Sequence, residues 1–139
     1  MTGPDIIYDY IKSMLGTKYR WAGDNPLSGY DCSGLVVEIL KASGVISEGS
    51  DLTAEGLRQK YSDRIVPFAS FGTLVFYGKT QATHVGFCLD QYFMVEAAGG
   101  DSGVTNTVEA SAKSAFVKVR PIFRRNDLLG LYQPKYTWE

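Results

Sequence analysis

The stretch Tyr30-Asp31-Cys32-Ser33-Gly34-Leu35 decides how this chain is interpreted, because it places a cysteine where a polar loop gives way to an apolar helical run. Residues 17–30 before it are rich in turn formers, and apolar residues recur after it at helical spacing up to about residue 42. Cys32 is therefore expected at or near the N-terminus of a helix that Gly44 ends. The unpaired N–H groups and the dipole of a helix start favour a thiolate, the form that attacks a carbonyl. A buried structural cysteine is the alternative.

The bulk properties are those of one globular domain. A length of 139 residues fits a single domain, so we expect one unit over residues 1–139. Hydrophobic residues make up 45% and charged residues 21% of the chain, which argues against disorder. The net charge is −1, and the basic residues are scattered except for Arg124-Arg125. Nucleic acid is therefore not an expected partner.

The N-terminal residues 1–5 lack the basic segment and apolar core of a signal peptide, and no apolar run approaches the ~18 residues of a membrane span. We therefore expect a protein that is made in the cytoplasm, is not exported by the usual route and does not span a membrane. Its two cysteines are too few for a disulfide framework.

The pattern of apolar residues changes along the chain from helical to β-rich. Pro4 and the apolar spacing after it predict a first helix that stops at Gly16, and Thr53 is the expected N-cap of a third helix through Lys60. The expected strands cover residues 73–77, 84–89, 92–97, 115–120 and 129–132, with a short helix at 108–114. Helices first and strands after predict an α+β fold in which N-terminal helices pack on an antiparallel sheet.

A cysteine nucleophile commonly works with a histidine, which takes the thiol proton and later protonates the leaving amine. The chain contains one histidine, His84, so a Cys–His mechanism has one candidate base. His84 opens an apolar run directly after the polar loop 78–83, and strand ends beside loops commonly hold catalytic groups. A structural or surface histidine is the alternative.

Glu96 is the candidate for the third residue, which would orient the imidazole and stabilise its cation. It is the lone charged residue in the apolar run 92–97, and an exposed strand glutamate is the alternative. Opposed residues of an antiparallel hairpin share a face. An odd-numbered loop near residues 90–91 therefore puts Glu96 on the face of His84. In one register Glu96 lies across from Gly86, whose missing side chain leaves room for the carboxylate. A two-residue loop would exclude Glu96.

Cys88 lies four residues beyond His84, or roughly 13 Å away at about 3.3 Å per strand residue. We therefore expect it to pack against the apolar face of the helix that starts at Cys32, and not to bond to Cys32. The same separation opposes a metal ion shared by Cys32, Cys88 and His84, because zinc ligands lie at about 2.0–2.3 Å from the metal. Neither a metal nor another cofactor is expected.

Several segments resemble the NlpC/P60 family of cell-wall cysteine peptidases. They are Gly16-Thr17-Lys18-Tyr19-Arg20-Trp21-Ala22-Gly23, Asp31-Cys32-Ser33-Gly34-Leu35-Val36, Thr83-His84-Val85-Gly86-Phe87 and Met94-Val95-Glu96-Ala97. The resemblance covers nearly the whole chain. A further segment, 71–76, is similar to a family strand but has Thr73 where Asp is usual. Segment 96–100 and the late segment 116–121 resemble compact members found among bacteriophage and prophage proteins.

The resemblance implies a papain-like α+β fold and hydrolysis of peptide bonds in peptidoglycan stems, commonly between D-γ-glutamyl and a diamino acid. By position it makes Cys32 the nucleophile, His84 the base and Tyr19 a hydroxyl that helps bind the substrate or the oxyanion. It makes Asp31 and Ser33 contacts for a free amino end of the substrate. The alternatives are that Asp31 only caps the helix and that Tyr19 only packs in its loop. Many family members have a second histidine at the position of Glu96, so this chain departs from the pattern there.

These expectations leave other functions open. An amidase or an acyltransferase would use the same Cys32 and His84 on a different bond, and a wall-binding or phage-tail assembly component would keep the fold without turnover. The expected substrate lies outside the cytoplasm, so delivery by a holin, a tail particle or a partner subunit would be needed. The bond cleaved, the need for a free substrate amino terminus, the delivery route and the oligomeric state do not follow from the sequence.

Overall fold

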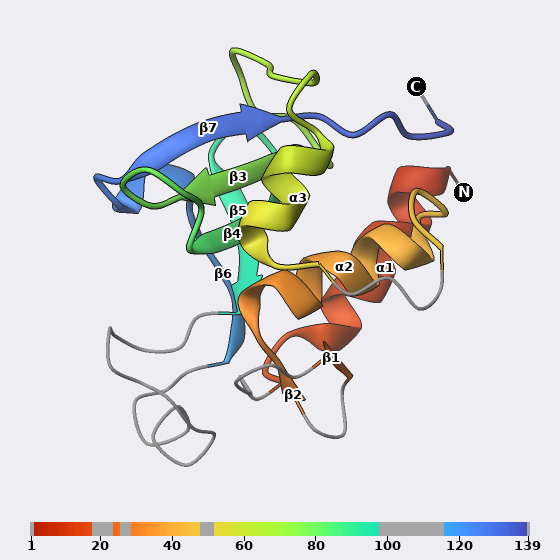
Figure 1. Ribbon diagram of the computed structural model, residues 1–139. Coiled ribbons are helices and arrows are strands. Elements are labelled where there is room, and N and C mark those ends of the chain that lie inside the picture. Colours follow the sequence, from red (N-terminus) through yellow and green to blue (C-terminus); the bar gives the residue numbers. More distant parts are fainter. Residues whose placement is uncertain (1, 18–23, 26–28, 48–51, 98–115, 139) are drawn as a thin grey trace.

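The chain forms helices packed on a five-stranded antiparallel sheet, which confirms the predicted α+β class (Figure 1). The computed structural model describes residues 2–17, 24–25, 29–47, 52–97 and 116–138. The order of the strands across the sheet is β6-β5-β4-β3-β7. Their bounds are β3 Leu74–Tyr77, β4 His84–Cys88, β5 Phe93–Ala97, β6 Val117–Pro121 and β7 Leu128–Tyr132.

The three predicted helices are confirmed, and each begins where its cap predicts. Helix α1 covers Gly3–Met14, α2 covers Cys32–Ala42 and α3 covers Ala54–Lys60. Thr2, Asp31 and Thr53 cap them in that order, and each side chain accepts a backbone N–H of the first turn. Gly44 follows α2 with φ of +74°, a conformation that favours glycine and ends the helix. The sequence did not predict the small hairpin of β1 (Asp24–Asn25) and β2 (Gly29–Tyr30) that precedes α2.

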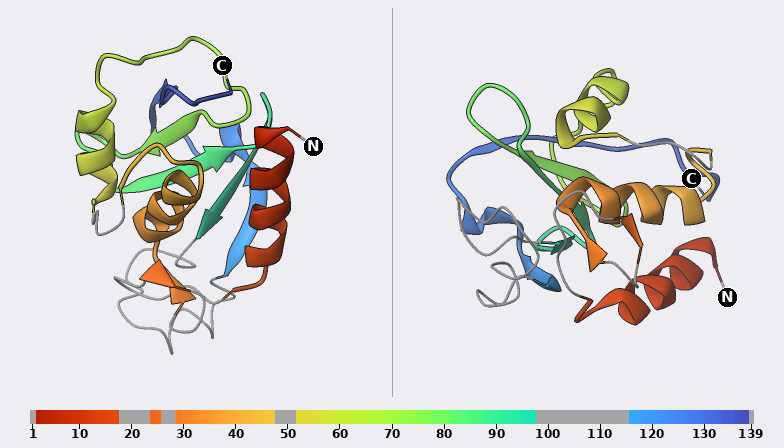
Figure 2. Two further views of the ribbon diagram at one scale, coloured as in Figure 1. Left: turned by 90° about the vertical axis from the view of Figure 1, so that its right-hand side faces the viewer. Right: turned by 60° about the horizontal axis from the view of Figure 1, so that its bottom comes forward.

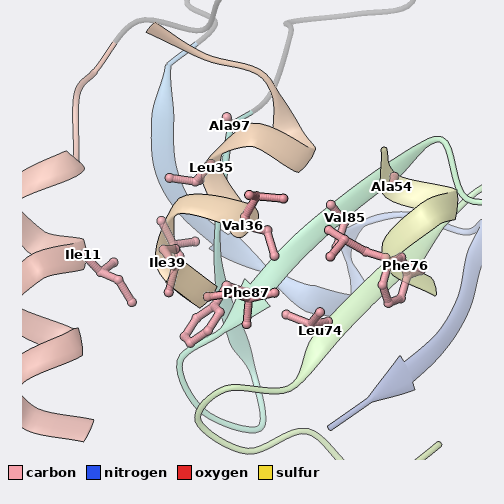
Figure 3. Close-up of a cluster of buried hydrophobic side chains, with 14 of the residues drawn as sticks. Ile11, Leu35, Val36, Ile39, Ala54, Leu74, Phe76, Val85, Phe87 and Ala97 are labelled. Atoms are coloured by element: carbon pink, nitrogen blue, oxygen red, sulfur yellow. The ribbon is translucent and has the colours of Figure 1, made fainter. Parts of the chain in front are cut away.

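The main core lies between α2 and one face of the sheet (Figure 3). Leu35, Val36 and Ile39 of α2 are fully buried there, against alternate residues of the central strands. Those strand residues are Leu74, Phe76, Val85, Phe87, Val95 and Ala97. Burying each large aliphatic side chain contributes roughly 1.5–3 kcal/mol, so this interface fixes α2, and with it Cys32, against β4 and β5. The views of Figure 2 show α1 beside α2.

A smaller cluster covers the opposite face of the sheet, and it corrects the prediction for Cys88. Cys88 is fully buried with Tyr77, Met94 and Ile122, in a cluster that contains no residue of α2. The reason is the two-residue period of a strand: Val85 and Phe87 face the helices, so His84, Gly86 and Cys88 face the other side. Burial raises the pKa of the Cys88 thiol strongly, which keeps this cysteine protonated and inert.

The predicted strands are confirmed with small shifts of their ends. The predicted helix at 108–114 lies outside the described residues. Among the helices that the structure describes, none has the length and apolarity needed to cross a bilayer.

Candidate active site

Cys32 is the first residue of α2, at the helix end where backbone N–H groups lack partners within the helix. The N-cap Asp31 accepts the N–H of Gly34 at 2.6 Å, and the Ser33 hydroxyl lies 3.5 Å from the same carboxylate oxygen. The thiol is partly exposed, and its Sγ lies 4.0 Å from the carbonyl oxygen of Thr83. The cap thus fixes the start of α2 and aims the thiol at the residue that precedes His84.

The turn over residues 78–83 places His84 at the start of β4, where it pairs with Tyr77. Thr83 donates its N–H to the Tyr77 carbonyl at 2.8 Å, and Ala82 donates its N–H to Glu55 of α3 at 2.7 Å. Gly78 opens the turn with φ of +152°, and a Cβ there would collide with the carbonyl of Gln81. The turn is therefore held from both sides, which fixes the position of the His84 ring.

Glu96 meets His84 directly, with Glu96 Oε1 2.6 Å from His84 Nε2. Phe87 pairs with Val95 and Cys88 with Met94, so the β4–β5 loop has the odd-numbered form, and continuation of the register puts Glu96 across from Gly86. One detail of the expectation was wrong. The space above Gly86 is filled by Met94, whose Sδ lies 2.5 Å from where a Cβ would stand. The carboxylate reaches the ring diagonally, as expected for this register, without using the space above Gly86.

Arg124 completes the cluster and was not predicted. It belongs to the short 3₁₀ helix η1 (Ile122–Arg124), which follows β6 directly. Its Nε donates to Glu96 Oε2 at 3.2 Å and its NH2 nitrogen donates to Glu96 Oε1 at 3.2 Å. The Glu96 side chain is fully buried, while the Arg124 side chain is 27% exposed. The carboxylate therefore lies between two cationic side chains, those of His84 and Arg124, and the Arg124 side chain also lines a surface cavity.

The electrostatics of the cluster favour a charged His84. Burial alone would lower the pKa of His84, but hydrogen bonds to Cys32 and Glu96 outweigh it and raise that pKa from 6.5 to about 9. Burial would likewise raise the pKa of Glu96, but His84 and Arg124 hold that pKa below its usual value. At neutral pH the cluster thus contains a carboxylate in contact with an imidazolium on one side and a guanidinium on the other.

Tyr77 packs against the His84 ring, and Arg125 packs against Tyr77. The Tyr77 and His84 rings are 5.7 Å apart, and the Arg125 guanidinium lies over Tyr77 at 4.8 Å from the ring centroid. The Tyr77 hydroxyl donates to the Ile122 carbonyl, which ties the sheet to η1. Arg125 is paired with Asp127 through two hydrogen bonds. These contacts restrict the movement of His84 and of η1.

The structure brings together three of the six predicted site residues, Cys32, His84 and Glu96, and Asp31 and Ser33 flank Cys32 at the start of α2. Tyr19 lies outside the described residues. The sequence contained two signals for Arg124: it belongs to the one basic pair in the chain, and a buried Glu96 needs a second partner. Within the described ranges, no group of three or more Cys, His, Asp or Glu side chains could hold a metal ion.

Comparison with known proteins gives consistent matches. A model of the NlpC/P60 family matches residues 16–121. The bifunctional muramidase/DL-endopeptidase CwlT of Bacillus subtilis is 34% identical over 93 residues, which cover 64% of this chain and 27% of CwlT. The chain thus spans about a quarter of that curated relative.

Two solved structures from Mycobacterium tuberculosis share the fold. The peptidoglycan hydrolase RipB matches with a TM-score of 0.68 at 24% identity, covering 94% of this chain and 63% of RipB. RipD, a non-catalytic NlpC/p60 domain protein adapted to peptidoglycan binding, matches with a TM-score of 0.69 at 20% identity, covering 96% of this chain and 98% of RipD. Since the family model matches more than half of its residues, this chain belongs to the NlpC/P60 family.

Proposed function

We propose that the chain is a cysteine endopeptidase that hydrolyses peptide bonds in peptidoglycan stem peptides. One observation carries the proposal: the thiol at the start of α2 interacts with the His84 ring, whose Nε2 is held by a buried carboxylate. Nucleophile, base and orienting group then form a line, the arrangement that cysteine and serine hydrolases share.

The first half of the reaction forms a thioester. In the reactive form the Cys32 proton is already on His84 Nδ1, the ring nitrogen left for it because Nε2 contacts Glu96, and Cys32 attacks as a thiolate paired with the imidazolium. Sγ bonds to the amide carbon while the carbonyl electrons move onto oxygen. The N–H groups at the start of α2 stabilise that oxyanion, and one such donor is typically worth about 100- to 1,000-fold in rate. When the C–N bond breaks, His84 gives its proton to the leaving amine.

The second half releases the acyl group. Water attacks the thioester carbon, its proton passes to His84, the C–S bond breaks and the thiol is restored. In the resting enzyme the pKa of His84, raised to about 9 by Cys32 and Glu96 against the effect of burial, keeps the ring protonated at neutral pH, so that it can serve as the acid for the leaving amine. The ring is neutral after that transfer and can then accept the proton of the attacking water.

We propose the bond between D-γ-glutamyl and a diamino acid as the substrate bond. The resemblance to the family supports this choice, as does the similarity to CwlT, a DL-endopeptidase. Asp31 and Ser33 flank the thiol and would contact a free substrate amino end, and Tyr19 would assist at the oxyanion. Because peptidoglycan lies outside the cytoplasm, we further propose that the enzyme acts there after delivery, with a phage particle as one route.

Digestion of purified peptidoglycan, followed by mass analysis of the released muropeptides, tests the proposal. The expected products carry a new D-glutamyl carboxyl end, and Cys32→Ala should abolish their release. Cys88→Ala is the matched control, because Cys88 is buried on the far face of the sheet and should leave the rate unchanged if the variant folds. Hydrolysis that persists in Cys32→Ala would refute the mechanism. Products cut at another bond would identify an amidase or acyltransferase.

Peptidoglycan binding without turnover is the second candidate, because RipD has the same fold and is non-catalytic. A thiol-directed alkylating probe at neutral pH separates the two. Rapid labelling of Cys32 that slows in His84→Gln favours the enzyme. Binding to peptidoglycan with an unreactive Cys32 favours the binding protein.

A further inference from the structure

The Glu96 carboxylate is fully buried, and each of its oxygens contacts a cationic side chain. Oε1 contacts His84 Nε2 at 2.6 Å and Arg124 at 3.2 Å, and Oε2 accepts from Arg124 Nε at 3.2 Å. A buried carboxylate without a cation would be driven to protonate. Two hydrogen bonds from the planar guanidinium fork also fix the plane of the carboxylate, which one contact would not do.

His84 cannot supply this support throughout a reaction cycle. In the proposed reaction it gives its proton to the leaving amine and is neutral until water returns one. During that interval Glu96 loses the positive charge at Oε1 while remaining buried. Arg124 keeps its charge at every step, because a guanidinium does not deprotonate in proteins.

We propose that Arg124 is a positioning residue, which keeps Glu96 ionised and oriented while His84 loses and regains its proton. The inference rests on the proposed function. It extends the site to a line of four side chains from four elements: Cys32 of α2, His84 of β4, Glu96 of β5 and Arg124 of η1.

Other charged and titratable groups lie around these four side chains and also affect the pKa values of Glu96 and His84. Tyr77 on β3, Lys118 on β6 and Arg125 after η1 interact with Glu96, and Asp127 interacts with His84. Arg125 is paired with Asp127. Arg124, by contrast, donates two hydrogen bonds directly to the Glu96 carboxylate. Its removal should therefore make Glu96 easier to protonate.

The test compares the pH dependence of kcat/KM for wild type, Arg124→Met and Arg124→Lys on a defined muropeptide. Arg124→Met should lower kcat by roughly 10- to 100-fold, the effect of a misplaced catalytic group. It should also move the acidic limb of the profile upward by about one pH unit or more, because Glu96 then protonates more easily. Arg124→Lys should restore much of the acidic limb, since it returns the charge but not the fork.

Arg120→Met is the matched control, because Arg120 of β6 pairs with Met94 of β5, so that the variant removes a positive charge next to the site and should leave the profile in place. A purely structural role for Arg124 predicts a lower rate with an unchanged profile. That result, or full activity in Arg124→Met, would overturn the proposal.

Two further measurements keep the inference testable. The NMR shifts of His84, the one histidine of the chain, report the protonation of its partner Glu96 even if wild type cleaves nothing. If the protein does not hydrolyse peptidoglycan, the NMR titration of His84 can therefore still test the role of Arg124. The Glu96 step should move to higher pH in Arg124→Met, and an unmoved step would overturn the proposal.

Chemical rescue offers a direct test of the guanidinium. Arg124 borders a cavity of about 500 Å³ that it shares with Lys79, Arg125, Asn126 and Asp127. Low millimolar guanidinium chloride should restore part of the activity of Arg124→Ala in a saturable manner, and should not restore the double variant Glu96→Gln/Arg124→Ala. Equal rescue of both variants would refute a role through Glu96.

Discussion

Replacing Glu96 with glutamine should lower the pKa of His84 by about one to two units, because a neutral amide keeps the shape of the carboxylate but not its charge. In the native cluster that pKa is raised from 6.5 to about 9, although burial of the ring opposes the change. At about 1.4 kcal/mol per unit, the net preference for the charged ring is about 3 kcal/mol. Cys32 and Glu96 supply this preference together.

The share that depends on the Glu96 charge follows from the strength of the contact. A hydrogen bond between charged groups is roughly twice as strong as a neutral one, so the amide should retain only part of the stabilisation. We expect a loss of about 1 to 3 kcal/mol, which corresponds to the fall of one to two pKa units. The sign is fixed: the alkaline limb of kcat/KM, which reports loss of the His84 proton, moves to lower pH.

Because the chain has one histidine, its ring can be titrated without ambiguity by ¹H–¹³C NMR. Glu38→Gln is the matched control, since Glu38 lies on α2 and accepts a hydrogen bond from Tyr10 of α1, with none to His84. The variant Glu96→Gln/Arg124→Met separates the lost carboxylate from the unpaired guanidinium. A wild-type ring that titrates near 6.5, or an unchanged pKa in Glu96→Gln, would refute the reasoning.

Two further predictions concern residues that frame the thiol and the histidine. Asp31→Ala should destabilise the protein by about 1 kcal/mol through loss of the α2 cap, whereas Asp31→Asn should keep the cap. Equal melting temperatures for the two variants would contradict the capping role. A raised KM of Asp31→Asn for substrates with a free amino end would show that Asp31 also contacts the substrate. Gly78→Ala should cost more than about 1 kcal/mol in the free energy of unfolding, because its Cβ would meet the Gln81 carbonyl at φ of +152°. Gly44→Ala, at φ of +74° in open space, should cost less by urea unfolding.

Much of the fold follows from local signals in the sequence. The start of α2 was predictable because Asp31 is a favourable cap residue and an apolar run follows it. The end of α2 was predictable because glycine readily adopts the positive φ that Gly44 has after the helix. The pairing of Glu96 with His84 was predictable only as a condition on loop length, because the two-residue strand period fixes the face but not the register.

The remaining features depend on contacts between distant parts of the chain. Arg124 reaches Glu96 because β6 pairs with β5 after an intervening segment, and no local pattern specifies that pairing. The misplacement of Cys88 had another cause. Its shared face with His84 was predicted correctly, but α2 packs on the alternate residues Val85 and Phe87. The apolar character of those two residues was the signal that would have assigned the helix to the other face.

The line of four side chains has a consequence for how this site can vary. When Cys32 gives its proton to His84, the charges alternate along the line as minus, plus, minus, plus, so that each buried charge is neutralised by its neighbours. A histidine at position 96 would carry no negative charge and would leave a guanidinium at position 124 without a counterion. Positions 96 and 124 should therefore covary across the family, with a carboxylate at one accompanied by a cation at the other.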